Sequence, residues 1–321
     1  MIKTRLTDRL GIRHPIVLGG MSRATAAEVV GAVSGAGGLG ILGISSMTPE
    51  EIRASCERIR SLTSAPFGLN ALLFGVSTEQ IDAIFACRPR AIATAWRRPD
   101  YDLRAFADRV HASGALHMHQ ADTLDEAKRA AEAGADVVVA QGTEGGGHVG
   151  VMATLPLARM VIRALPNIPV LVAGGIADGA GIAAALVLGA DGVLLGTRFL
   201  ATNEAPLPDG YKRAIVESDG HDTLITEIPD IVSGTVWPGG LPGCAATVSS
   251  RSGSDARASF AGAGARSSPR CRPRGPQATP TGARCSWERT PASSIRSNRP
   301  ARSSNVSRGT RRRSSAAAHA I

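Results

Sequence analysis

Paired cysteines are missing from this sequence of 321 residues. None of its five cysteines stands in a C-x-x-C pair or at metal-ligand spacing from a histidine, which argues against a zinc site and against a disulfide framework. We therefore expect no metal, and a reducing, cytoplasmic setting is the default expectation. The five are Cys56, Cys87, Cys244, Cys271 and Cys285.

Long apolar runs are missing as well. The amino terminus, MIKTRLTDRLGI, is charged throughout and lacks the apolar core that a signal peptide needs. The longest apolar stretches are strand-sized or are interrupted by glycine and acids, so none reaches the length of a membrane span. The sequence therefore predicts neither export nor a membrane partner.

Leucine, lysine and methionine are absent from residues 244–321, which consist mostly of Ser, Arg, Ala, Pro, Gly and Thr. Such a segment cannot bury enough apolar surface to offset its ordering entropy, so we expect a disordered tail here and a folded domain over residues 1–243. Residues 251–321 carry a net charge of +13, which leaves −4 for residues 1–250 out of the total of +9. The basic charge belongs to the tail alone and predicts no nucleic-acid partner for the folded part.

Three interpretations of this tail compete. It could be an Arg-rich interaction segment that binds phosphates, as the run Arg311 to Arg313 suggests, or a flexible linker. The preferred interpretation is a frameshift, in which GC-rich DNA is translated out of frame, because a genuine tail rarely begins where a fold still needs helices. On that hypothesis the protein binds any ligand weakly or folds poorly, and an inactive remnant of a fold becomes an alternative for its function.

A strand-then-helix unit recurs along the chain with short connections, giving eight expected strands and seven expected helices. This succession predicts a closed parallel barrel, the (β/α)8 TIM barrel of the α/β class, with an open doubly wound sheet as the alternative. One helix has a clear start, since Thr48 can cap it, Pro49 suits its first position and Glu51 can close a capping box. The expected strands cover residues 14–20, 39–43, 66–72, 91–96, 115–120, 136–140, 169–175 and 191–200, and the helices 24–36, 48–62, 78–87, 101–113, 123–133, 155–165 and 179–188.

The stretch AQGTEGGGHVG, residues 140–150, follows the sixth expected strand. Its three glycines, Gly145, Gly146 and Gly147, allow positive φ and a close approach to a ligand, and they place His148 beside it. We interpret the stretch as a flexible loop that brings cofactor and chemistry together. The alternative is a glycine-rich turn with a solvated histidine.

Barrels of this class carry their sites on the loops that follow the strands. At those positions this sequence is rich in glycine and amide side chains. The residues after strands seven and eight stand where such barrels bind phosphate, although the same glycines could serve only to allow tight turns. The loop positions are Gly19, Gly20, Met21, Asn70, Gln120, Gln141 to His148, Ala173, Gly174, Gly175, Gly196 and Thr197.

Several segments together resemble the nitronate monooxygenases, formerly called 2-nitropropane dioxygenases. They are HPIVLGGM, AGGLGILG, PFGLN, AQGTEGGGHVG, PVLVAGGIADGAGIAAALVLGADGVLLGTRFL and ITEIPDIVSGTVWPG, and they cover about residues 1–240. The most specific element is the GGH loop followed by AGGIADG and GTRF at the right distances. The resemblance implies a TIM barrel that holds FMN non-covalently and oxidises an alkyl nitronate, such as propionate 3-nitronate, with O2 to a carbonyl compound and nitrite.

The resemblance also implies roles for individual residues. His148 corresponds to the family's active-site histidine. Along the isoalloxazine ring would lie Gly19, Gly20 and Met21, with Asn70 and Gln120 bonded to its polar edge. Gln141 and Gly146 would touch the ring or the ribityl chain. The phosphate would be bound by Gly174, Gly175, Gly196 and Thr197. Gly147 and Ala173 are also expected to bind the cofactor.

The GGH and AGGIADG motifs also occur in the flavin-dependent enoyl-acyl-carrier-protein reductases, which take hydride from a nicotinamide cofactor. The segment ITEIPDIVSGTVWPG and the lack of an evident basic patch for an acidic carrier favour the nitronate interpretation. The expected partners are therefore a small-molecule nitronate and O2, and a homodimer stays open.

The sequence also predicts the orientation of two histidines and raises two alternatives for one tryptophan. His117 and His119 alternate along the fifth strand, so both should face the helices if Gln120 faces the barrel mouth. Trp96, at the end of the fourth strand, could wall the pocket or pack under the loop.

Overall fold

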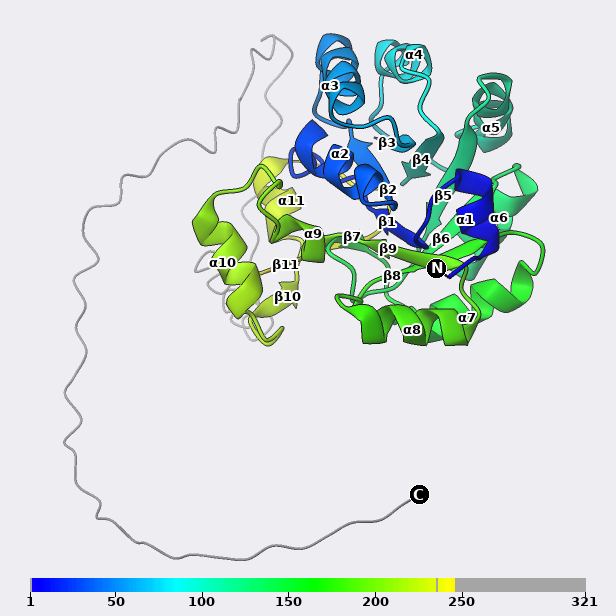
Figure 1. Cartoon of the computed structure of the whole chain (residues 1–321). Helices are drawn as coiled ribbons and strands as arrows, with labels where there is room; N and C mark the ends of the chain where they lie inside the picture. Colours follow the sequence, from blue (N-terminus) through cyan, green and yellow to red (C-terminus); the bar gives the residue numbers. More distant parts are fainter. Residues whose placement is uncertain (1, 235, 246–321) are drawn as a thin grey trace, which may run out of the picture. The chain divides into compact units, whose positions relative to one another are not determined.

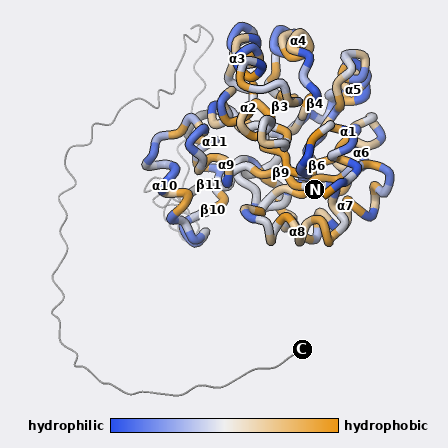
Figure 2. The backbone as a smooth tube through the Cα atoms, viewed as in Figure 1, coloured by the Kyte–Doolittle hydropathy of each residue, from blue (hydrophilic) through white to orange (hydrophobic). Residues whose placement is uncertain are grey.

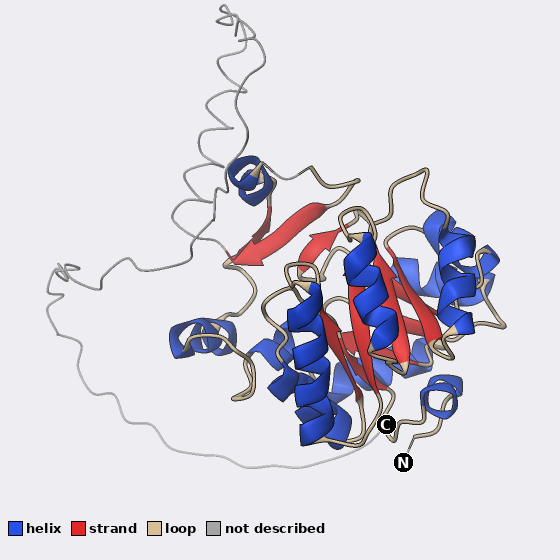
Figure 3. Ribbon diagram, turned by 90° about the horizontal axis from the view of Figure 1, so that it is seen from above, coloured by secondary structure: helices blue, strands red, loops and turns tan. Residues whose placement is uncertain are grey.

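The computed structural model describes residues 2–234 and 236–245. Eight parallel strands close into a barrel in the order β1-β2-β3-β4-β5-β6-β8-β9, and a helix follows each of the first seven (Figure 1). Seen from above, the helices surround the strands (Figure 3). The predicted TIM barrel is confirmed. The barrel strands are β1 (Ile16–Leu18), β2 (Leu39–Gly43), β3 (Phe67–Leu72), β4 (Ala91–Ala95), β5 (Leu116–Ala121), β6 (Val137–Gln141), β8 (Val170–Ala173) and β9 (Gly192–Leu195).

The seven surrounding helices begin and end close to the predicted positions. They are α2 (Ala27–Gly35), α3 (Pro49–Leu62), α4 (Thr78–Ala86), α5 (Leu103–Ala112), α6 (Leu124–Glu132), α7 (Thr154–Ala164) and α8 (Gly179–Leu188). The capping box expected for α3 is present, because Thr48 accepts from the backbone of Glu51 while the Glu51 carboxylate accepts from the backbone of Thr48. In the described part of the chain, no helix has the length and apolar character that crossing a bilayer requires.

Apolar side chains form two cores, one inside the barrel and one between the strands and the helices. The strands are mostly apolar along the tube in Figure 2 because both of their faces are covered. Helix α1 (Arg5–Leu10), which the sequence reasoning missed, contributes Leu6 and Leu10 to the inner core. Arg5 fixes this helix beside β9 through an ion pair of 2.7 Å with Asp191.

The strand expected over residues 191–200 is wrong in its second half. Strand β9 ends at Leu195, and Thr197–Leu200 forms the single helical turn α9. The backbone of Gly196, with φ −111° and ψ −84°, leaves the extended region between them. The stretch VLLGTRFL has large apolar residues on both sides of Gly196, and so short a stretch does not distinguish a strand from a helix by its periodicity, which explains the error.

The expectation of a flexible loop around His148 is also corrected. Strand β7 (Gly147–Val149) pairs antiparallel with β11 (Leu241–Ala245), so that His148 lies opposite Pro242. Strand β11 also pairs with β10 (Thr223–Ile225). Helices α10 (Asp209–Glu217) and α11 (Ile228–Ser233) lie in the same part of the sequence.

Strand β11 extends two residues past the predicted domain boundary at residue 243. The rest of the segment predicted to be disordered, residues 246–321, lies outside the described residues. The frameshift hypothesis and the arginine run of the tail therefore stay predictions.

Candidate active site

The loop after β1 touches strand β3 and the segment after β9 at the carboxyl end of the barrel. Gly20 approaches β3 so closely that an added Cβ would lie 2.5 Å from the Cβ of Asn70. The sulfur of Met21 lies against Gly196, where an added Cβ would be 3.4 Å away. An added Cβ on Gly19 would likewise lie only 2.8 Å from Cδ2 of Leu194. A side chain at position 19 or 20 would therefore have to displace the wall of the mouth.

Amide side chains from two neighbouring strands line the next part of the mouth. Nε2 of Gln120 donates a hydrogen bond to Oε1 of Gln141. Nε2 of Gln141 in turn donates to the carbonyl oxygen of Gly146, 3.3 Å away. An added Cβ on Gly146 would lie 3.3 Å from Oγ1 of Thr197. A chain of contacts thus joins β5 and β6 to the segment after β9.

The turn after β8 and the start of α9 present unpaired backbone N–H groups. Gly174 and Gly175 have φ values of +109° and +68°, a region that favours glycine. Among residues 2–234 and 236–245, the backbone N–H groups of Gly175, Thr197 and Arg198 donate to no acceptor. All three residues are exposed. Exposed N–H groups without an acceptor are suited to an anion such as a phosphate.

His148 is held by an acid and two tryptophans. Its Nε2 lies 2.9 Å from Oδ2 and 3.1 Å from Oδ1 of Asp230, on α11. The imidazole stacks on Trp237, with centroids 3.4 Å apart and planes 16° apart, and Trp96 lies edge-on at 6.4 Å. Only 12% of the His148 side chain is exposed. A carboxylate can only accept hydrogen bonds, so Nε2 carries the proton of a neutral imidazole and Nδ1 is the atom that can accept another.

A family model described as nitronate monooxygenase matches the chain in two overlapping stretches, residues 3–96 and 73–234. The chain belongs to the nitronate monooxygenase family. Membership implies a flavin cofactor. The crowded glycines, the amides and the unpaired N–H groups at the mouth are chemical groups of the kind that bind such a cofactor.

Proteins that are similar to this chain carry functional names that differ from the name of the family. The (3aS,4S,5R,7aS)-5-hydroxy-7a-methyl-1-oxo-octahydro-1H-indene-4-carboxyl-CoA dehydrogenase of Mycobacterium tuberculosis is 37% identical over 227 residues, which are 70% of this chain and 63% of that protein. The chain thus spans less than two thirds of that relative's length.

Among solved structures, FabK from Thermotoga maritima has a TM-score of 0.71 and 34% identity, with 78% of this chain and 77% of that chain covered. Nitroalkane oxidase from Streptomyces ansochromogenes has a TM-score of 0.62 and 31% identity, with 69% and 75% covered.

Two of the residues expected to bind the cofactor take no part in the contacts described above, although each is the direct neighbour of a residue that does. Gly147 pairs with Gly243 in the outer sheet, and an added Cβ would meet no atom within 4 Å. Ala173 lies inside β8, and its carbonyl oxygen accepts from the backbone of Gly142 at 3.0 Å. Their roles stay predictions, as do those of the other expected site residues.

Asp230 and Trp237 are the functional candidates that the sequence reasoning missed. Both lie in the segment ITEIPDIVSGTVWPG, from which only a resemblance to the family was inferred. The available signal was an acid and a large aromatic residue in a segment beyond the barrel. Nothing in the sequence paired either with His148, because the contact with Asp230 joins residues 82 positions apart.

A buried chain of polar side chains lies outside the mouth, between β4, β5 and α6. Oγ1 of Thr94 is 2.8 Å from Nε2 of His117 and 2.8 Å from Nδ1 of His119. Nε2 of His119 is 3.1 Å from the Glu126 carboxylate. Because Glu126 accepts, neutral His119 accepts from Thr94, and Thr94 accepts from His117. Both histidines face the helices, which confirms the expectation.

The folded protein is expected to lose about 2 kcal/mol of stability between pH 6.5 and pH 4.5 through His117. Burial lowers the pKa of His117 from 6.5 to about 3, so in this window the unfolded chain binds a proton that the folded chain does not. The contribution is complete above pH 6.5 and is lost as the pH falls. Urea denaturation at several pH values should show this slope in the wild type and a shallower one in His117→Gln. Equal slopes would contradict the assignment.

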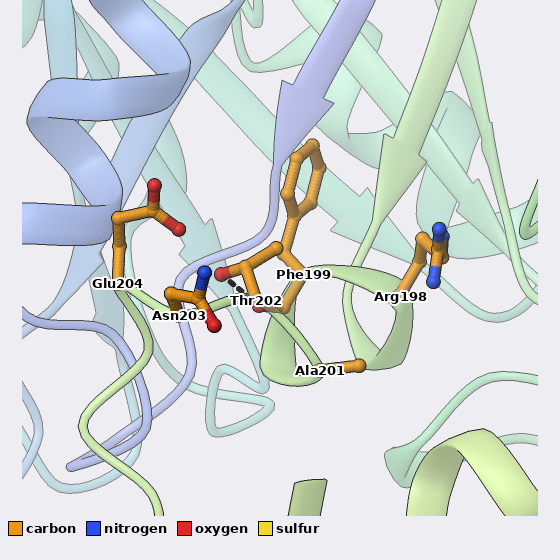
Figure 4. A pocket seen from close by; sticks show the side chains of 6 residues that line it. All are labelled: Arg198, Phe199, Ala201, Thr202, Asn203 and Glu204. Carbon is orange, nitrogen blue, oxygen red and sulfur yellow. Dashed lines mark hydrogen bonds between the residues drawn. The ribbon is translucent and has the colours of Figure 1, made fainter.

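A pocket of about 460 Å³ lies beside α9 (Figure 4). Oγ1 of Thr202 donates to the carbonyl oxygen of Phe199 at 2.8 Å, and the side chains of Glu204 and Arg198 lie on opposite sides of the segment. The pocket shares Arg198 with the row of free N–H groups, whereas neither His148 nor the glycine turns contribute to its lining. Its lining consists of Arg198, Phe199, Ala201, Thr202, Asn203 and Glu204.

Proposed function

We propose that the chain is an FMN-dependent oxidoreductase that oxidises alkyl nitronates with O2 to a carbonyl compound and nitrite. The observation that carries the proposal is the enclosed His148, paired with Asp230 and stacked on Trp237. The family match and the likeness to a nitroalkane oxidase support the substrate class. Cys56 and Cys87 are free, and a reducing, cytoplasmic compartment is part of the proposal.

The residues at the mouth have the chemistry to hold FMN. Gly19 and Gly20 offer backbone surface without side chains, which suits a flat ring. The amides of Gln120 and Gln141 offer donors and acceptors to the ring edge. The free N–H groups of Gly175 and Thr197 would donate to the phosphate. When bound, FMN supplies the electron acceptor for the substrate and passes the electrons on to O2.

His148 would act on the substrate directly. A nitronate is an anion with carbanion character at carbon, and an imidazolium form of His148 would donate to its nitro oxygens from Nδ1–H while Nε2–H stays bonded to Asp230. With a neutral nitroalkane, Nδ1 of His148 would first take the α-proton. Asp230 would then stabilise the imidazolium through Nε2–H, and it holds the ring in the tautomer that leaves Nδ1 free to accept.

The aromatic surroundings of His148 favour a small substrate. Trp237 has its ring centroid 4.8 Å from that of Phe74 and 5.9 Å from that of Trp96. These rings and Asp230 leave little of the imidazole exposed. A short planar nitronate therefore suits this site better than a long acyl chain.

Redox chemistry on an acyl thioester is the second candidate. It is favoured by the 37% identity to the CoA dehydrogenase of Mycobacterium tuberculosis, against 31% for the nitroalkane oxidase. The enoyl-thioester reduction expected as the alternative from the sequence belongs to the same class.

Aerobic assays of the purified, FMN-supplemented protein separate the two candidates. Nitrite release from propionate 3-nitronate without NADPH oxidation is the expected result. Turnover of an enoyl or acyl thioester without nitrite release would assign the chain to the second candidate. A protein that retains FMN and acts on neither class would refute both.

Asp230→Asn is expected to lower kcat for a neutral nitroalkane about 10- to 100-fold, the usual cost of losing an orienting partner. The amide can donate to Nε2 and so select the tautomer that has its proton on Nδ1. The matched control is Asp219→Asn, because Asp219 pairs with His221 at 3.4 Å on the exposed surface. An Asp230→Asn variant as active as this control would contradict the orienting role.

A further inference from the structure

Trp96 lies directly after β4 in a backbone conformation that tryptophan rarely adopts. Its φ is +53°, in the left-handed region where a bulky side chain is strained. Such a conformation persists only when the surroundings fix it. One fixed point is its carbonyl oxygen, which accepts from the backbone N–H of Phe74 at 2.9 Å. The ring of Trp96 lies edge-on to both His148 and Trp237.

The next residue, Arg97, anchors this corner of the chain to α6. Its Nε and Nη2 donate to the two carboxylate oxygens of Glu126 at 2.8 and 3.0 Å, a bidentate pair. Its Nη1 donates to the carbonyl oxygens of Arg98 at 3.2 Å and Pro99 at 3.1 Å. The side chains of Arg97 and Glu126 are only 12% and 17% exposed. One guanidinium thus ties the turn after Trp96 to a fixed carboxylate.

Glu126 is itself held from two sides. Its backbone N–H donates to Oγ1 of Thr123, the residue that caps α6. Its carboxylate also accepts from Nε2 of His119, which Thr94 holds in turn through Nδ1. Burial alone would raise the pKa of Glu126, but hydrogen bonds from His119 and Arg97 bring it to about 2. The carboxylate stays charged at neutral pH.

We propose that Glu126 is a positioning residue that acts through Arg97 to hold Trp96 against His148. The inference rests on the function proposed above, because it assigns His148 to the chemistry. Glu126 does not reach the mouth residues itself, and its effect passes through the corner at Trp96. The ordinary surface pair Glu28 with Arg58, at 3.1 Å and about half exposed on both sides, has no such connection.

The first test follows Trp96 without using activity. The full-length protein, supplemented with FMN, is labelled with 5-fluorotryptophan, and each of its three tryptophan resonances is assigned by a Trp→Phe substitution. Glu126→Gln should shift the Trp96 resonance in the ¹⁹F spectrum, whereas the control Glu28→Gln should leave it in place. An unchanged Trp96 resonance in folded Glu126→Gln would overturn the proposal.

The second test is kinetic. Glu126→Gln should lower kcat for the nitronate or nitroalkane about 10- to 100-fold, since misplacement of about 1 Å can cost about 10²-fold. A purely structural role would instead lower Tm and leave the kcat of the folded enzyme and its pH profile unchanged, which would refute positioning. If the wild type turns over no substrate, the proposed function fails, and the Trp96 resonance still decides whether Glu126 positions this ring.

Arg97→Lys is the second variant, and it preserves the positive charge. Lysine cannot reproduce the bidentate contact or reach the carbonyl oxygens in the same geometry. The Trp96 resonance and kcat of Arg97→Lys should therefore change as in Glu126→Gln. Wild-type values for both in Arg97→Lys would show that charge alone suffices and would overturn positioning by the guanidinium.

Discussion

Gly175→Asp is expected to abolish FMN retention in the purified protein. The backbone N–H of Gly175 is free among the described residues and, in the proposed site, donates to the FMN phosphate. A carboxylate about 4 Å from one phosphate charge is repelled by about 4 kcal/mol near a protein surface, which corresponds to a roughly thousandfold higher Kd. Flavin fluorescence released on denaturation, together with titration of the apoprotein with FMN, measures the effect.

Gly175→Asn is the matched control for this substitution. Asparagine and aspartate have nearly the same shape, and both tolerate the left-handed φ of +68° better than other side chains do. An added Cβ would lie 3.4 Å from Cβ of Glu144, so both variants have the same room. The asparagine variant should therefore retain FMN far better. Equal loss in both would mean that space rather than charge is responsible, and retention in both would refute the phosphate site.

Local sequence patterns were sufficient to predict the barrel. β-branched and leucine-rich strands alternate with helices whose starts carry recognisable caps, as Thr48 and Glu51 show at α3. The same patterns failed where a strand gives way to a helical turn within a few residues, as at Gly196 between β9 and α9. They also failed at α1, whose capping box pairs Thr4 with Thr7 instead of with a glutamate.

The surroundings of His148 could not be predicted from local patterns, because tertiary contacts create them. The glycines of the GGH loop were interpreted as flexibility, yet Gly147 and His148 extend and pair with β11, almost a hundred residues further along the chain. That pairing belongs to the same region as α11, whose Asp230 reaches His148. Trp96 and Trp237 converge on the imidazole from separate segments, so the closure of the site depends on the segment after the barrel.

If His148 is a base, its loss should affect the turnover of two related substrates to different extents. A neutral nitroalkane needs a base to remove its α-proton, whereas a preformed nitronate has already lost that proton. Base catalysis contributes about 10²- to 10⁴-fold to a rate. A single hydrogen bond to a nitro oxygen contributes about 1 kcal/mol, or less than about tenfold. The ratio of the two losses in one variant therefore distinguishes a base from a donor.

His148→Asn is accordingly expected to lower kcat/KM for a neutral nitroalkane by about 10²- to 10⁴-fold, and that for the matching nitronate by no more than about tenfold. Asparagine keeps a polar side chain between Trp96, Trp237 and Asp230 but cannot take up the proton. His221→Asn is the matched control, because His221 also faces an aspartate but is 93% exposed. Equal losses on both substrates would rule out the base and leave His148 as a donor, and undiminished activity on both would remove it from the reaction.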